Sequence, residues 1–520
     1  MGNLSVSQTV DHAPERERAK RQLTINPPVF FTSGLLLLAL LSFGIIYTER
    51  ASRLFANLLD GVSTYFGWLY VGSVAFFIFL SFRLLFGRYA SLRLGRDHER
   101  PEFSTPTWFA MLFSAGMGIG LVFYGVAEPI MHYTDPPSLP AGSFAARAQA
   151  LPLTMFHWGI HAWAIYVLMG LSVAYFSYRK GLPLAIRSCL YPILGDRIYG
   201  IPGHAVDIIA VFGTLFGLAT SLGLGAMQVS AGLSRLIGTP HTTSFQLVLI
   251  VIITVCATIS LVTGVSGGIR RLSELNMILA AVLLVFVFAA GPTLSILDSM
   301  VQAMGGYLST IINRTFVVGA HNPETKEWSK SWTLFYWGWW IAWAPFVGLF
   351  IARVSRGRTI REFVLGVLVV PTAVTFVWFS VFGATALHLD AEGAGIAQAV
   401  SADISTAVYV TLDKLPLSGI TSALTATLVA VFFVTSSDSA SYVVDMLTSG
   451  GHPNPPIWQR IFWASAEGAC AAVLLYAGGK KALTALQAAV VSIGLPFCLV
   501  LLLISVSLMR ALRAERPPTG

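Results

Sequence analysis

Charged side chains are scarce in this chain of 520 residues. Asp, Glu, Lys and Arg make up 11% of the sequence, whereas 55% of the residues are hydrophobic. Soluble domains carry roughly 25% charged residues, and a single soluble core stops growing at about 250–300 residues. The chain therefore lacks the polar surface that a soluble protein of this length needs, and we expect a bilayer to be its solvent.

Cysteine pairs and common catalytic motifs are also missing. The four cysteines lie in separate apolar segments without a CxxC pair or a metal-ligand spacing, at Cys189, Cys256, Cys470 and Cys498. We interpret them as packing residues. The sequence contains neither HExxH nor a phosphate-binding glycine loop followed by Lys, so we do not expect an enzyme.

Long apolar runs fill most of the chain. A run of about 20 residues is long enough to cross a bilayer as a helix. We therefore predict an all-α integral membrane protein with twelve transmembrane helices, at residues 29–48, 66–87, 106–131, 150–178, 204–236, 243–265, 273–296, 332–352, 363–388, 417–447, 458–478 and 482–512. The first run is long and has no small-residue cleavage site, so we interpret it as a retained helix.

The predicted segments divide into two units of five helices. The third and eighth segments are five helices apart, and both contain glycine or proline interruptions. An odd repeat length inverts one unit relative to the other, which would bring both interruptions to one site at the middle of the membrane. The expected parts are a cytoplasmic tail at 1–28, two extra helices at 29–100, a first repeat at 101–296, an outer loop with an amphipathic helix at 297–331, a second repeat at 332–512 and a short cytoplasmic tail at 513–520.

Basic residues indicate which side of the protein faces the cytoplasm. With the N-terminus inside, the inner segments hold 23 of the 33 Lys and Arg residues, and the outer loops hold 10. This bias favours an even number of helices with both termini in the cytoplasm. The net charge of +8 has the same explanation, and we expect no nucleic-acid partner.

Three glycines stand at alternate positions in the third segment, at Gly116, Gly118 and Gly120. Each glycine costs a helix about 1 kcal/mol. Two interpretations stay open, which are tight packing of helices through small residues and an unwound stretch that forms an ion or substrate site. Glu128 follows in the same segment, directly before Pro129. We interpret it as a structural or gating carboxylate.

Aromatic residues gather in the fourth and eighth segments. The spacing of Trp158, Trp163 and Tyr166 allows all three to lie on one broad helical face. Residues 335–345 contain four tryptophans within seven residues. A belt at the level of the lipid headgroups would explain one or two of these rings. A cage for a quaternary ammonium group, which is attracted by tryptophan faces, would explain all of them.

Hydroxyl groups gather at residues 432–439, near the end of the tenth segment. The hydroxyls of Thr435 and Ser436 could bond back to the preceding helical turn. Alternatively, they are hard oxygen ligands that suit sodium. Asp438 is an acidic residue within the membrane, which makes it a functional candidate by default, although it could also pair with a loop arginine.

In these features the sequence resembles the betaine/choline/carnitine transporter family. The resemblance runs from Asn26 to the twelfth segment, and the motifs that carry it are specific to the family. They are the glycine run at 115–120, the helix-entry stretch at 156–163, the region of Trp340 and the sequence RVSRGRT at 353–359.

The resemblance implies a LeuT-like fold of two inverted five-helix repeats after two extra helices, often trimeric, in the bacterial plasma membrane. It implies alternating access with Na⁺ as the coupling ion and no other cofactor. The substrate residues that correspond to those of the family are Trp158, Trp163, Tyr166, Trp340 and Trp343. The corresponding sodium ligands are backbone oxygens near Ser114, Met117 and Phe432, and the hydroxyls of Thr435 and Ser436.

Departures from the family's variants bear on the transported solute. Carnitine exchangers place an arginine inside the fifth segment, whereas residues 205–234 contain no Lys or Arg. Some proton-coupled choline importers have an acidic residue at the position of Gly120. Both differences favour sodium and a zwitterion, although the sequence around 183–203 and 262–276 is most similar to choline importers.

Sodium-coupled import of glycine betaine is therefore the expected function. Choline uptake driven by sodium or protons is the first alternative, and carnitine/betaine exchange is a weaker one. A channel would not need an aromatic cage, and its flux would not depend on sodium.

Overall fold

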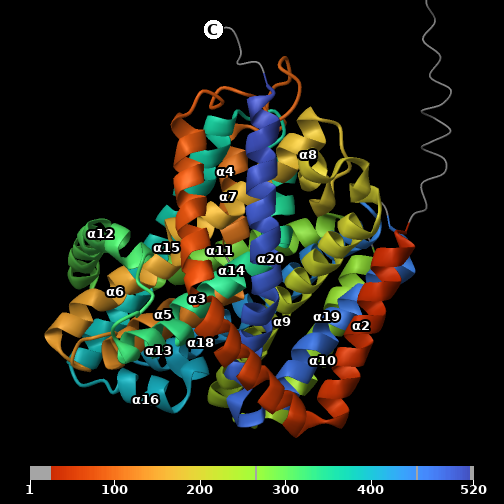
Figure 1. Cartoon of the computed structure of the whole chain (residues 1–520). Coiled ribbons are helices and arrows are strands. Elements are labelled where there is room, and N and C mark those ends of the chain that lie inside the picture. Colours follow the sequence, from red (N-terminus) through yellow and green to blue (C-terminus); the bar gives the residue numbers. More distant parts are fainter. Residues whose placement is uncertain (1–24, 117, 264–265, 453–454, 516–520) are drawn as a thin grey trace, which may run out of the picture.

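The computed structural model describes residues 25–116, 118–263, 266–452 and 455–515, and the regular elements in these ranges are all helices. Figure 1 shows them packed as one bundle. The long helices are α2 (Pro27–Ile46), α3 (Thr48–Phe86), α9 (Ile201–Ile237), α10 (Thr243–Thr263), α11 (Ser266–Ala290), α14 (Thr333–Val354), α15 (Ile360–Ala391), α18 (Ser418–Thr448), α19 (Ile457–Gly478) and α20 (Ala482–Arg513). The predicted all-helical class is confirmed.

Shorter helices complete the bundle. They are α4 (Thr105–Gly116), α5 (Ile119–Thr134), α6 (Phe144–Trp158), α7 (Ile160–Ala174), α8 (Tyr191–Leu194), α12 (Thr293–Thr315), α13 (Pro323–Ser331), α16 (Ile396–Ala402) and α17 (Ala407–Leu412). The π-helix η1 (Tyr175–Arg179) continues α7, and single 3₁₀ turns lie at η2 (Ile186–Leu190), η3 (Gly195–Tyr199), η4 (Ile404–Thr406) and η5 (Gly479–Lys481). In total, eleven helical segments of the described residues are long and apolar enough to cross a membrane.

The predicted third segment is a broken helix. Helix α4 ends at Gly116, α5 begins at Ile119, and Gly118 between them is extended, with φ −163° and ψ −177°. Each half is shorter than the roughly 20 residues that a membrane crossing needs. This is why eleven helical segments meet the criterion of length, whereas twelve segments were predicted.

The fourth and eighth segments differ from their predictions. The fourth is interrupted at Gly159, between α6 and α7, where a Cβ would lie 2.6 Å from the carbonyl oxygen of Met155. The interruption predicted for the eighth segment is wrong, because α14 continues through both Gly338 and Pro345. A Cβ on Gly338 would lie 2.8 Å from Cα of Val491. Gly338 therefore lets α14 pack closely against α20 and does not break the helix.

The predicted outer loop contains two helices. Helix α12 covers the stretch in which an amphipathic helix was expected, and α13 follows it. Figure 1 shows α12 at the edge of the bundle, beside α6 and α15. One face of α12 is buried through Ile296, Ala303 and Tyr307, while Val301 and Leu308 are exposed. The exposed surface of α12 therefore carries an apolar stripe that this chain does not cover, beside polar residues such as Asp298 and Gln302.

Burial separates an inner group of helices from a peripheral one. In the most apolar stretch of each helical segment, 94% of the residues are buried in α6–α7, 83% in α13–α14 and 78% in α9. The corresponding share is 33% in α2 and in α10, and 22% in α11. A helix that exposes apolar residues on most of its surface is suited to lipid contact. The inner helices α6, α7, α9 and α14 therefore surround the centre of the bundle.

The described bundle begins and ends on the same side. The backbone N–H of Asn26, just before α2, donates to the carbonyl oxygen of Thr448 at the end of α18 at 2.8 Å. Helix α19 then returns the chain across the bundle, so α20 ends on the side where α18 ends. The two described ends of the chain therefore lie on one face of the bundle.

On this face, the sequence at 353–359 connects the loop before α15 with the loop before α4 through hydrogen bonds. Arg358 donates to the carbonyl oxygen of Phe103 at 2.8 Å and to the hydroxyl of Thr105 at 3.1 Å. Gly357 has a φ of +80°, and a Cβ there would lie 2.3 Å from the carbonyl oxygen of Arg100. The loop before α15 is thus held against the loop before α4.

Glu515 anchors the chain after α20. Its carboxylate contacts Arg179 at 3.1 Å and Lys180 at 2.6 Å, and it accepts a hydrogen bond from the hydroxyl of Tyr175 at 2.9 Å. Burial alone would raise the pKa of Glu515, but the hydrogen bonds from these three partners outweigh it and lower the pKa to about 2. The end of α20 is therefore fixed to the end of α7.

Candidate binding site

A cavity of about 130 Å³ lies at the centre of the bundle, beside the break between α4 and α5. Residues of α5, α6, α7, α9, α11, α14, α15 and α18 line it. The structure brings together ten residues that were predicted from the sequence, which are Gly118, Gly120, Trp158, Trp163, Tyr166, Trp340, Trp343, Phe432, Thr435 and Ser436. Residues that are distant in sequence thus form one compartment.

Two predicted sodium ligands have no described side chain. Met117 lies outside the described residues, and so does the side chain of Ser114. The backbone at Gly116 is described as the last residue of α4. The glycine break itself is therefore established, while the whole of the predicted sodium site stays a prediction.

Aromatic rings form one wall of the cavity and meet mainly edge to face. The centroids of Trp158 and Trp340 are 4.9 Å apart at an interplanar angle of 71°. Those of Trp163 and Tyr166 are 5.3 Å apart at 73°, and Tyr166 lies 6.4 Å from Trp340. Gly159 allows Trp158 and Trp163 to belong to separate helices that both face the cavity. The rings form a contiguous aromatic surface of the kind that attracts a cation without hydrogen-bond donors.

Trp339 is a further wall residue that the sequence did not single out. Its ring stacks on Trp340 at 4.9 Å, and its Nε1 donates to the carbonyl oxygen of Gly217 at 3.3 Å. Neighbouring residues of a helix point about 100° apart, so sequence spacing alone favours only one of the two tryptophans. The other lining residues not predicted include Ser221, Ser273, Asn276, Thr375 and Ser439.

Two glycines make room for the tryptophans. A Cβ on Gly120 would lie 2.8 Å from Cη2 of Trp339 and 3.1 Å from Cη2 of Trp158. A Cβ on Gly217 would lie 1.7 Å from Cδ1 of Trp343. By contrast, a Cβ on Gly118 would have no neighbour within 4 Å. Gly120 is therefore fixed by the rings, whereas Gly118 faces open space.

Hydroxyl groups of α18 form another part of the lining. The Thr435 hydroxyl donates back to the carbonyl oxygen of Val431 at 3.0 Å and accepts from Nδ2 of Asn276 at 3.3 Å. The interpretation of Thr435 as a back-bonded hydroxyl is therefore confirmed, while its role as a sodium ligand stays a prediction for a hydroxyl that lines the cavity. Asp438 is buried on α18 but is not among the residues that line the cavity.

Among the residues that the structure describes, none that lines the cavity is Asp, Glu, Lys, Arg or His. A charged ligand would therefore meet aromatic faces, hydroxyl groups and backbone atoms. The backbone donors lie at the N-terminus of α5, where Gly118, Ile119 and Gly120 line the cavity. A helix N-terminus carries a partial positive charge that favours an anionic group. The cavity thus offers surfaces of opposite polarity to the two ends of a zwitterion.

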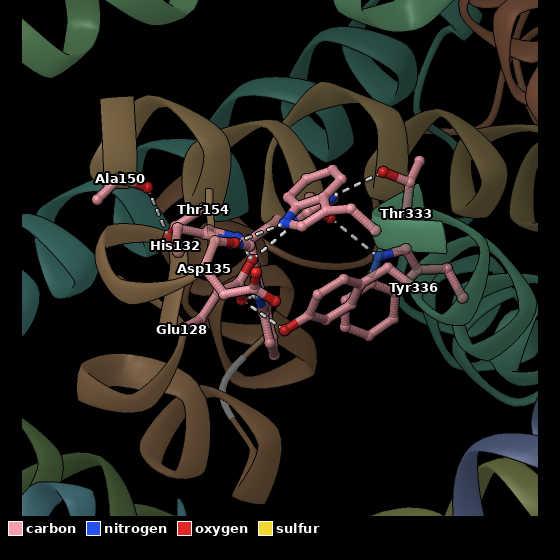
Figure 2. A network of polar contacts seen from close by, with 11 residues as sticks. Glu128, His132, Asp135, Ala150, Thr154, Thr333 and Tyr336 are labelled. Atoms are coloured by element: carbon pink, nitrogen blue, oxygen red, sulfur yellow. Dashed lines mark hydrogen bonds and ion pairs between the residues drawn. The ribbon is translucent and has the colours of Figure 1, made fainter. Parts of the chain in front are cut away.

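A buried polar network closes the cavity at the N-terminal end of α14. Nε1 of Trp158 donates to Oε2 of Glu128 at 2.7 Å, and the Tyr336 hydroxyl donates to the same oxygen. Oε1 of Glu128 contacts Nδ1 of His157 at 2.7 Å and Nε2 of His132 at 3.1 Å. Figure 2 shows Glu128 and Tyr336 pointing toward one another. The Glu128 carboxylate thus contacts four side chains, which agrees with the structural role that was predicted for it.

The same network contains a set of possible metal ligands. Ligand atoms of Glu128, His132 and His157 lie within 4.8 Å of one another. A carboxylate has about four lone-pair sites, and all four of Glu128 face a hydrogen-bond partner in this structure. The carboxylate of Glu128 is therefore fully hydrogen-bonded, so its geometry supports hydrogen bonding more than metal binding.

The described lining residues of α14 and α18 extend toward one end of the bundle. Those on α14 run from Trp339 to Phe350, and those on α18 run from Phe432 to Ser439. Both sets lead toward the C-terminal ends of these helices, where the sequence at 353–359 lies. The network around Glu128 lies toward the other end of α14, where Thr333 and Tyr336 belong to it.

Comparison with known proteins agrees with this arrangement. A family model described as BCCT, betaine/carnitine/choline family transporter, matches residues 28–517. The chain belongs to this family and is therefore a multi-pass membrane transporter.

Three relatives show what is known among similar chains. The glycine betaine transporter OpuD of Bacillus subtilis is 47% identical over 475 residues, which cover 91% of this chain and 92% of the relative. The glycine betaine transporter of Acinetobacter baylyi is 44% identical and covers 96% of this chain and 75% of its own. A glycine betaine/proline/choline/ectoine transporter of Vibrio parahaemolyticus is 45% identical and covers 94% and 88%.

Proposed function

We propose that the protein imports glycine betaine by sodium-coupled symport. One observation carries the choice of ligand, which is a central cavity with an aromatic wall and no charged residue in the described part of its lining. Such a surface suits a quaternary ammonium group, which carries charge but no N–H donor. The names of the relatives in Bacillus subtilis and Acinetobacter baylyi point to the same solute.

Glycine betaine would bind with its two charged ends on different surfaces. The trimethylammonium group would lie against Trp158, Tyr166 and Trp340. The carboxylate would face the N-terminus of α5, where the backbone N–H groups of Ile119 and Gly120 have no partner in the preceding turn. The distance between the two surfaces would then select solutes by length as well as by charge.

Sodium would bind between the broken third segment and α18. The hydroxyls of Thr435 and Ser436 and the carbonyl oxygen of Phe432 would supply one half of the site, and backbone oxygens of α4 near Ser114 and Met117 the other. Sodium would then hold the break in the conformation that forms the substrate site. By linkage, each ligand would raise the affinity for the other by the same factor.

We further propose that α4 and α5 together make one crossing, which brings the number of crossings to twelve. Two inverted repeats, from α4 to α11 and from α14 to α20, would then follow α2 and α3 in a LeuT-like arrangement. The distribution of Lys and Arg favours the end of α20 as cytoplasmic. With this orientation the cavity leads inward, as in an inward-facing state of alternating access. The family resemblance and the uncovered apolar face of α12 support a homotrimer in the bacterial plasma membrane.

Choline uptake, coupled to sodium or protons, is the second candidate. The relative in Vibrio parahaemolyticus is named for choline as well as for glycine betaine. Choline would use the same aromatic wall, but its hydroxyl would make little use of the N-terminus of α5.

The test is uptake of labelled glycine betaine and labelled choline into proteoliposomes. An inward sodium gradient is compared with an inward proton gradient alone. Betaine uptake that stops without sodium is the expected result. Choline uptake driven by protons would overturn the sodium assignment, and saturable uptake of neither solute would overturn the proposed function.

A further inference from the structure

Glu128 lies directly behind the aromatic wall of the cavity. Its side chain is fully buried, and its Oε2 accepts a hydrogen bond from Nε1 of Trp158 at 2.7 Å. The ring of Trp158 itself lines the cavity. Glu128 does not line the cavity, so it can act on a ligand only through the ring that it holds.

The carboxylate has no strong cationic partner. In the part of the chain that the structure describes, no Lys or Arg nitrogen lies within 4 Å of it, and its Oε1 contacts only the ring nitrogens of His132 and His157. A buried charge without a partner is costly even when it accepts hydrogen bonds. A cation that enters the cavity would recover part of this cost.

A hydrogen bond to a carboxylate also changes the donor. As the N–H of an indole donates to an anion, the bond polarises and electron density moves into the ring. A more negative ring face attracts a cation more strongly. The effect requires the N–H to point away from the ligand and toward the carboxylate, which is the orientation of Trp158 here.

We propose that Glu128 is a specificity-determining positioning residue, whose carboxylate acts through Trp158 to make the cavity prefer a quaternary ammonium ion over a neutral molecule of the same shape. This inference rests on the proposed function, because it concerns the same cavity. It also fixes the orientation of a zwitterion, since the carboxylate of glycine betaine is repelled from the side on which Glu128 lies.

The size of the effect follows from Coulomb's law. With roughly 7 Å between the two charges across the indole ring and an effective dielectric constant of about 20, the attraction corresponds to a change in affinity of about fiftyfold. The hydrogen bonds to Glu128 spread its charge, so we expect a change on the order of tenfold.

The test compares choline with 3,3-dimethylbutan-1-ol, in which carbon replaces the charged nitrogen. Each competes with labelled glycine betaine for binding to the purified full-length transporter, and the ratio of the two affinities is measured. Glu128→Gln should lower this ratio about tenfold and leave the affinity for the neutral alcohol within about twofold. A purely structural role of Glu128 would weaken the binding of both competitors alike.

The matched control is Glu467→Gln. Glu467 is also fully buried, and it accepts hydrogen bonds from Ser437 at 3.0 Å and Ser441 at 2.8 Å, but it does not line the cavity. The ratio should be unchanged in this variant. An equal fall in both variants would show a general effect of losing buried charge and would overturn the proposal.

Tyr336→Phe gives a second test if Glu128→Gln does not fold. This variant keeps the carboxylate and leaves Trp158 as the single donor to Oε2, so the preference for choline should be retained or increased. A fall in the ratio with the carboxylate in place would overturn the inference, and so would an unchanged ratio in a folded Glu128→Gln. If the wild-type protein binds neither choline nor glycine betaine, the proposed function itself fails and the inference with it.

Discussion

Replacement of Gly120 by alanine tests the geometry of the aromatic wall most directly. The new Cβ would lie 2.8 Å from Cη2 of Trp339 and 3.1 Å from Cη2 of Trp158. Ordinary contacts of a Cβ begin at about 3.4 Å, so the ring of Trp339 must move by about 0.6 Å, the difference between 3.4 and 2.8 Å. Both rings are buried among other aromatic residues, and neither can move outward freely.

The free-energy cost of the added methyl group follows from substitutions in other well-packed protein interiors. An extra methyl group in a well-packed site costs about 1–3 kcal/mol. If this cost falls on the ligand-bound form, the Kd for glycine betaine rises about 5- to 150-fold. Binding is measured by the change in tryptophan fluorescence on titration with glycine betaine, and KM is measured by uptake into proteoliposomes.

Gly118→Ala is the matched control, because it adds the same methyl group two residues away. Its Cβ has no neighbour within 4 Å, and its backbone is extended, a conformation that alanine adopts readily. We expect a change in Kd of no more than about twofold. Equal losses in both variants would refute the steric argument, and so would a Gly120→Ala transporter with the affinity of the wild type.

Three further predictions address other parts of the molecule. Trp340→Ala should raise the KM for glycine betaine about thirtyfold or more, since it removes about 2 kcal/mol of cation–π attraction. Uptake at the wild-type level, with equal protein in the membrane, would exclude this ring from the site. The double variant Thr435→Ala and Ser436→Ala should raise the sodium concentration for half-maximal uptake about thirtyfold, at about 1 kcal/mol for each of the two lost oxygen ligands. An unchanged sodium dependence would place the ion elsewhere. Glu515 has a pKa of about 2 in the folded protein against 4.5 when unperturbed. Its contribution to the free energy of unfolding, up to about 3 kcal/mol, is therefore complete above pH 4.5 and is lost as the pH falls toward 2. Glu515→Gln should therefore lower the Tm at pH 7 and much less at pH 3, whereas an equal difference in Tm at both pH values would disprove the ion-pair account.

Much of the fold was predictable because the bilayer restricts what a chain can do. Backbone polar groups in hydrocarbon must be satisfied within a segment, so long apolar runs become helices. The break in the third segment was also predictable, because glycines at 116, 118 and 120 weaken a helix at one point. Gly338 carried the same signal but has a different role, since its missing side chain is used for packing against α20.

The candidate site was predictable as a set of residues but not as a geometry. Trp340 and Trp343 stand out by their number and spacing, and the family resemblance assigns them a role. Trp339 lines the same cavity, but the composition of the segment does not distinguish it from its neighbour Trp340. Gly159 was not recognised as an interruption, because one glycine within an apolar run is common.

The partners of Glu128 were beyond the reach of the sequence. His132 lies four residues away on the same helix, but Trp158 and Tyr336 come from segments 30 and 208 residues distant. The sequence by itself determined that this chain is a helical membrane protein with one weak helix and two aromatic segments, because composition and local propensity act on each segment separately. Only the tertiary structure decided which aromatic rings face one cavity and which carboxylate lies behind them, because those contacts depend on how helices distant in sequence pack together.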